Sequence, residues 1–131
     1  MVLTPCIIKY LLLNSVKRSK VRYMTTPEKK VKERVKKVLD KLDAYYFLPS
    51  QMYGRKGIPD IIVCYQGKFF GIECKANNNK PTKLQIHELN KIQKAGGCAI
   101  VFTDKTTTEE LESFLRGDNK DGSHWALQNI S

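Results

Sequence analysis

The fold is decided by the stretch KGIPDIIVCYQGKFFGIECK, which runs from residue 56 to residue 75. Its apolar runs 61–65 and 68–75 predict two strands, and the Gln66-Gly67 between them favours a hairpin. If Gln66-Gly67 is a two-residue turn, the register places Asp60 directly opposite Glu73, with Cβ atoms about 5 Å apart. A three-residue loop with a glycine bulge would shift this pairing by one residue.

Asp60, Glu73 and Lys75 form the candidate catalytic cluster of this hairpin. Glu73 and Lys75 are two residues apart on one strand, so their side chains share a face. Two facing carboxylates repel each other, and a divalent cation between them removes the repulsion. Oxygen ligands without nearby histidine or cysteine ligands indicate Mg²⁺. Such a cation can polarise a phosphoryl oxygen and activate a water molecule, while the ammonium stabilises the developing charge.

A Glu and a Lys two residues apart on a strand more commonly lie on a solvent-exposed face without a catalytic role. Three features oppose it here: the strands are too apolar for a surface hairpin, Pro59-Asp60 stands at a strand entrance, and the chain is basic. It has 23 Lys and Arg against 13 Asp and Glu, a formal net charge of +10. Such a chain attracts polyanions, most commonly nucleic acid, although an acidic membrane surface would attract it too.

The length of 131 residues suits one domain. Residues 1–23 contain an apolar stretch that is too short to span a membrane, followed by positive charges. Because Met24 could be an alternative start, we expect this tail to lie outside the working domain, residues 24–131. The four cysteines form no CxxC pair, which indicates a reducing, cytoplasmic environment. Cys64 and Cys98 lie within apolar runs and are expected to be buried.

Helices and strands alternate along the remainder of the chain. Thr26-Pro27 predicts the start of a first helix that ends near residue 42, and Thr107 with Glu110 predicts a capping box for a last helix. The other expected elements are a short strand at 45–48, a helix at 82–95 and a strand at 98–102. The order α-β-β-β-α-β-α predicts an α/β sandwich around a mixed sheet of about four strands. We expect the helices at 82–95 and 107–116 to cover one sheet face.

Gly57-Ile58-Pro59-Asp60, followed after twelve residues by Glu73-Cys74-Lys75, resembles the PD-(D/E)xK nuclease motif. With Lys56 and the helix start Thr82-Lys83-Leu84-Gln85, residues 25–116 more narrowly resemble the VRR-NUC family, whose stand-alone members are often of phage origin. The resemblance implies the restriction-endonuclease-like fold and phosphodiester hydrolysis dependent on Mg²⁺ or Mn²⁺. It also implies that Asp60, Glu73 and the main-chain carbonyl of Cys74 hold the metal.

The resemblance adds two further site residues, each with a purely structural alternative. Gln85 shares a helix face with Leu89 and matches the site glutamine of the family, but it could instead cap its own helix. Glu28 matches the first-helix glutamate of the family, but it could instead serve the helix dipole or a capping box with Thr25.

Basic loop residues flank the predicted site and are interpreted as phosphate contacts. They are Arg55, Lys56, Lys80 and Lys83, which could equally be plain solubility charges. His87 and His124 have no partner at catalytic spacing and are assigned no role.

The function predicted from these features is a Mg²⁺-dependent endodeoxyribonuclease that leaves 5′-phosphate and 3′-hydroxyl ends. The resemblance predicts a homodimer that acts on branched DNA such as four-way junctions. A dimer would also cover apolar residues that the first helix does not easily cover, among them Tyr45, Phe47, Phe69 and Phe70. Alternative specificities are flap, nick or sequence-specific duplex cleavage. Alternatives of another class are a non-catalytic nucleic-acid-binding module and a membrane-surface protein.

Overall fold

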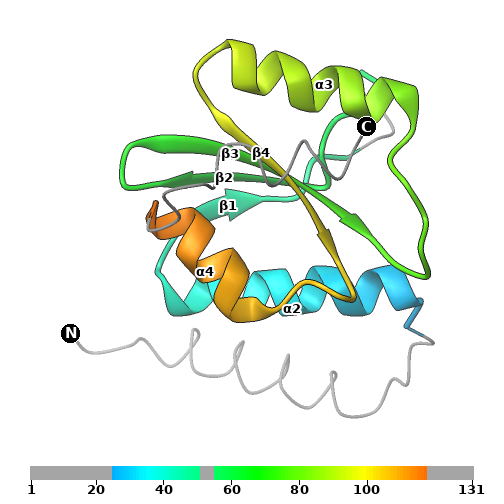
Figure 1. The fold of residues 1–131 in the computed structure, drawn as a ribbon. Helices are drawn as coiled ribbons and strands as arrows, with labels where there is room; N and C mark the ends of the chain where they lie inside the picture. Colours follow the sequence, from blue (N-terminus) through cyan, green and yellow to red (C-terminus); the bar gives the residue numbers. More distant parts are fainter. Residues whose placement is uncertain (1–24, 51–54, 118–131) are drawn as a thin grey trace, which may run out of the picture.

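The computed structural model describes residues 25–50 and 55–117, which form a four-stranded sheet between layers of helices (Figure 1). The expectations for the tail 1–23, for His124 and for the segment from residue 118 onward lie outside the described residues. The element order confirms the prediction: α2 (Pro27–Lys41), β1 (Tyr45–Phe47), β2 (Ile61–Tyr65), β3 (Lys68–Lys75), α3 (Lys83–Lys94), β4 (Cys98–Thr103) and α4 (Thr108–Arg116).

The sheet is mixed, with strand order β1-β2-β3-β4. β1, β2 and β3 are antiparallel neighbours, whereas β4 runs parallel to β3. Tyr65 pairs with Lys68, so Gln66-Gly67 is the predicted two-residue turn, and both of its residues have positive φ angles of 49° and 75°. These angles are those of a primed hairpin turn, which Gln66 adopts although glutamine is uncommon there.

The main core lies between the sheet and a layer formed by α2 and α4 (Figure 1). Val35 and Leu39 of α2 are fully buried there, and the rings of Phe70 and Phe114 meet edge to face with centroids 5.7 Å apart. The expectation that 107–116 shares a sheet face with 82–95 is therefore wrong. After β4 the chain turns toward α2, where Arg34 donates to the carbonyl of Thr106 at 2.7 Å.

Of the described helices, only α3 covers the opposite sheet face, where it packs on β3 and β4 (Figure 1). Tyr45, Cys64 and Phe69 form a cross-strand row on this same face, in which Phe69 borders the end of α3, and Phe47 lies in the next row. These four residues, the uncovered sheet surface, are exposed: 74% for Tyr45, 49% for Phe47 and 45% for Phe69. Cys64 is exposed, so the prediction that it is buried is wrong.

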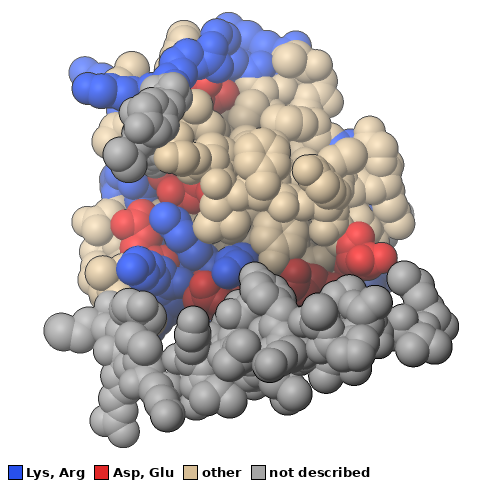
Figure 2. All heavy atoms as spheres, turned by 180° about the vertical axis from the view of Figure 1, so that it is seen from behind, with Lys and Arg blue, Asp and Glu red and all other residues tan. Residues whose placement is uncertain are grey.

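Phe70 differs from the three exposed aromatic residues. Phe70, expected to need cover from outside, is only 1% exposed because Phe114 of α4 packs on it. On the side of the molecule opposite to the view of Figure 1, uncharged side chains form a broad area beside a group of acidic and basic ones (Figure 2). In the described part of the chain, no helix combines the length and apolar character that crossing a bilayer requires.

Candidate active site

Two glycines allow the loop before β2 to lie against α3. Gly57 has a φ of 86°, and a Cβ at this position would lie 2.8 Å from the backbone of Leu84. A Cβ on Gly71 would lie 2.5 Å from Ile92 of α3 and 3.1 Å from the ring of Pro59. Larger residues would push these segments apart. The glycines therefore fix the place where Pro59 and Asp60 enter the sheet.

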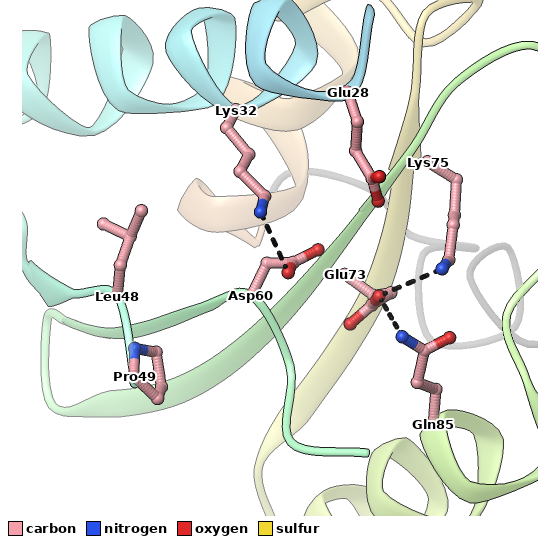
Figure 3. Close-up of a pocket in the computed structure, with 8 residues that line it drawn as sticks. All are labelled: Glu28, Lys32, Leu48, Pro49, Asp60, Glu73, Lys75 and Gln85. Atoms are coloured by element: carbon pink, nitrogen blue, oxygen red, sulfur yellow. Dashed lines mark hydrogen bonds and ion pairs between the residues drawn. The ribbon is translucent and has the colours of Figure 1, made fainter. Parts of the chain in front are cut away.

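Asp60 uses both carboxylate oxygens at the entrance to β2 (Figure 3). Its Oδ2 accepts a hydrogen bond from the main-chain N–H of Cys74 at 2.9 Å, and its Oδ1 lies 3.2 Å from Nζ of Lys32. The β2–β3 register, in which Ile61 pairs with Ile72, brings Asp60 to the end of the ladder beside Glu73 and Cys74. This confirms the predicted register.

Glu73 is the buried carboxylate of the cluster, with an exposure of only 1%. Its Oε1 accepts a hydrogen bond from Nε2 of Gln85 at 2.7 Å and lies 3.5 Å from Nζ of Lys75. Its Oε2 has no hydrogen-bond partner among the described residues. Burial, followed by the charge of Asp60, raises the pKa of Glu73 to about 8, and the charge of Lys75 offsets only part of this rise.

Gln85 caps its own helix, and its side chain also contacts Glu73. Its Oε1 accepts a hydrogen bond from the N–H of Thr82 at 2.8 Å, which completes a capping box at the start of α3. Its Nε2 donates to Oε1 of Glu73 at 2.7 Å (Figure 3). One amide side chain therefore contacts both the helix cap and the buried carboxylate.

Glu28 completes the acidic group. One carboxylate oxygen from each of Glu28, Asp60 and Glu73 can be chosen so that all lie within 4.8 Å of one another. They open into a cavity of about 450 Å³ (Figure 3), which is lined by Glu28, Lys32, Leu48, Pro49, Asp60, Glu73, Lys75 and Gln85.

Lys32 is the site residue that the sequence analysis missed. It lies one turn after Glu28 on α2, and this i, i+4 spacing on the face of the predicted site glutamate was the signal available. Burial by itself would lower the pKa of Lys32, but the charge of Asp60 and the hydrogen bond to it outweigh burial and raise the pKa above its ordinary value.

The predicted basic contacts differ in their surroundings. Nη2 of Arg55 lies 2.8 Å from Oε2 of the buried Glu88 on α3, so this side chain already has an anionic partner. Lys56, Lys80 and Lys83 are exposed.

The thiol of Cys74 is buried in the core, and this burial raises its pKa. The main chain of Cys74, by contrast, contacts the carboxylate of Asp60.

The site fits a divalent cation with oxygen ligands. Two ammonium groups, Lys32 and Lys75, face three clustered carboxylates, and one buried oxygen of Glu73 has no hydrogen-bond partner within residues 25–50 and 55–117. A buried carboxylate oxygen without a hydrogen-bond donor is costly unless a cation binds it. Burial also raises the pKa of Glu73, the charge of Asp60 adds to this rise, and the charge of Lys75 offsets only part of it.

A pH-dependent stability should follow from Glu73 in metal-free buffer. Because its pKa in the folded protein, about 8, exceeds the ordinary value of 4.5, the folded state binds this proton more tightly than the unfolded state. The stabilisation is complete below pH 4.5 and is lost as the pH rises to about 8. We expect the free energy of unfolding in EDTA to fall by a few kcal/mol, at about 1.4 kcal/mol per pKa unit.

Denaturant titrations at pH 5, 6.5 and 8 measure this change, and Glu73→Gln is the matched control because its side chain cannot titrate. The pH dependence of the glutamine variant should be smaller by the amount assigned to Glu73. Equal pH dependence in the two proteins would contradict a raised pKa at this position.

Comparisons with known proteins identify a nuclease relative and a similar solved structure. The chain is 35% identical over 77 residues to "Putative nuclease p44" of Acyrthosiphon pisum secondary endosymbiont phage 1, covering 58% of this chain and 75% of that protein. A solved structure described as "VRR_NUC domain" superposes with a TM-score of 0.58 at 27% identity, covering 66% of this chain and 95% of the other. No protein-family model matches.

The fold and the relatives together define a nuclease of the α/β class with a mixed four-stranded sheet. The chain belongs to the VRR-NUC family. The predicted family, fold class and enzyme class are thereby confirmed.

Proposed function

We propose that this VRR-NUC nuclease is a Mg²⁺-dependent endodeoxyribonuclease, with Mn²⁺ able to substitute, that leaves 5′-phosphate and 3′-hydroxyl ends. The observation that carries the proposal is the buried Oε2 of Glu73, which has no hydrogen-bond partner in the described part of the chain and lies in a cluster of three carboxylates beside a lysine. A binding-only module has no use for such a costly group, since phosphates are bound by positive charge. We assign the activity to residues 24–131 and its site of action to the cytoplasm.

Asp60, Glu73 and the main-chain carbonyl of Cys74 would hold the cation, with Glu28 beside them. When bound, the cation would polarise a phosphoryl oxygen and lower the pKa of a water molecule. Gln85 holds Glu73 through the 2.7 Å hydrogen bond to Oε1, while the buried Oε2 has no hydrogen-bond partner among the described residues. Lys75, whose side chain is only 13% exposed, supplies an ammonium that stabilises the charge developing on the phosphate.

The decisive experiment uses labelled linear, nicked, flap and four-way DNA, each with Mg²⁺ or with EDTA. We expect cleavage only with Mg²⁺, and mapping of the cut ends gives the polarity of the products. Cleavage in EDTA would overturn the metal-dependent mechanism. DNA binding without cleavage in any divalent metal would favour the non-catalytic module. Preferential cleavage of linear, flap or nicked DNA would favour the alternative specificities.

We further propose that the protein acts on four-way junctions as a two-fold dimer. Cleavage of two strands of a junction needs two sites, and this chain supplies one. The uncovered sheet surface supports a dimer, because three exposed aromatic residues lie on one face and a self-complementary contact would bury them. Phe70 no longer belongs to this argument, since α4 covers it.

Sedimentation at micromolar concentration tests the dimer. We expect a two-fold assembly that is weakened at least tenfold by Phe47→Ser with Phe69→Ser, since about 1.4 kcal/mol of lost contact gives this factor. Replacement of the exposed Leu84 on α3 with serine is the control and should leave the assembly unchanged. A strict monomer would remove the junction proposal and leave the nuclease assignment intact.

A further inference from the structure

Lys32 lies between the proposed cation ligands and the open cavity. It extends from α2 toward Asp60, whereas Lys75 comes from β3 beside Glu73 (Figure 3). The Lys32 side chain is 29% exposed, so it is accessible from the cavity that both lysines line. A phosphate entering this cavity would therefore have an ammonium available from each of two elements.

The contact of Lys32 with Oδ1 of Asp60 would compete with a cation that bound through the same oxygen. Asp60 uses Oδ2 for the N–H of Cys74, and Lys32 lies at Oδ1. A cation that binds Asp60 through Oδ1 would repel the ammonium and remove its anionic partner. The lysine side chain has a long flexible stem, and its ammonium carries three donors that suit a phosphate oxygen.

We propose that Lys32 is a second phosphate-binding residue of the active site: it pairs with Asp60 until a cation binds there and then contacts the substrate phosphate. This inference rests on the proposed function and adds a residue to it. With a cation held at Asp60, the ammonium of Lys32 would be free to bind the phosphate. A purely structural Lys32 would instead stabilise Asp60 in the same way with and without a cation.

The test uses Ca²⁺, a probe for oxygen-ligand sites, and the variant Lys32→Met. Without DNA, calorimetric titration should show about threefold to tenfold tighter Ca²⁺ binding by the variant, because the competing ammonium is gone. Fluorescence anisotropy with four-way DNA should show several-fold weaker binding by the variant in saturating Ca²⁺ and unchanged binding in EDTA. Lys37→Met, on an exposed position of the same helix, should show neither the Ca²⁺ effect nor this dependence on Ca²⁺.

Lys32→Gln, which can still donate to Asp60, serves as a second variant if methionine disturbs folding. Unchanged or weaker Ca²⁺ binding by the folded variants would overturn the proposal, as would an equal loss of DNA affinity in EDTA and in Ca²⁺. If the wild-type protein neither binds Ca²⁺ nor cleaves DNA with Mg²⁺, the proposed function itself fails. If the wild type does both and the Lys32 variants match it, only the role of Lys32 fails.

Discussion

Glu73→Gln and Asp60→Asn should each abolish DNA cleavage while most of the affinity for DNA remains. Each change removes one negative charge from the proposed cation site, and a bound cation contributes several kcal/mol of transition-state stabilisation. At about 1.4 kcal/mol per factor of ten, we expect losses on the order of 10³-fold or more. Binding survives because phosphate contacts come from basic residues outside the carboxylate pair.

The two variants have different structural consequences. Glutamine at position 73 can still accept from Nε2 of Gln85, so the buried position keeps its main contact. Asparagine at position 60 can accept from the N–H of Cys74 but leaves Lys32 without a charged partner. Glu112→Gln is the control, because this carboxylate pairs with Lys41 and Arg116 away from the cavity. Near-wild-type cleavage by Asp60→Asn in Mg²⁺ would refute the mechanism.

The sequence predicted the geometry around Asp60 and Glu73 because both residues belong to one hairpin. A two-residue turn and two apolar strands determine the register locally. Only twelve residues separate Asp60 from Glu73, which leaves few alternative registers. The capping box of Gln85 is local too, since Thr82 lies three residues away. The helix-capping role of Gln85 could be predicted for the same reason.

Features that depend on packing between distant elements were not predictable in the same way. The side of the sheet on which α4 lies depends on where the chain turns after β4, near Arg34 of α2, a contact across 72 residues. From the sequence, Arg55 is interpreted as a phosphate contact. In the structure Arg55 forms an ion pair with Glu88, which lies 33 residues away in the sequence. Lys32 resembled the other lysines of a basic helix until the fold showed that it faces Asp60.

Lys75→Ala should lower the rate of cleavage on the order of 10³-fold, because it removes an ammonium beside the reacting phosphate. The structure adds a second effect. Nζ of Lys75 lies 3.5 Å from Oε1 of Glu73, and its charge lowers the pKa of that carboxyl. In the alanine variant the pKa of Glu73 should rise further, so near neutral pH part of the loss would come from weaker cation binding.

Measuring kcat at saturating Mn²⁺, at pH 7 and at pH 9, separates these two effects. At pH 9 Glu73 is ionised in the wild type, and a high Mn²⁺ concentration favours its ionised form in the variant as well. If Lys75 acts on the transition state, most of the loss persists under these conditions. Lys94→Ala, at an exposed position near the end of α3, is the charge-matched control and should cleave normally. Recovery of near-wild-type kcat at pH 9 would show instead that Lys75 acts only by keeping Glu73 ionised, as a positioning residue for the cation.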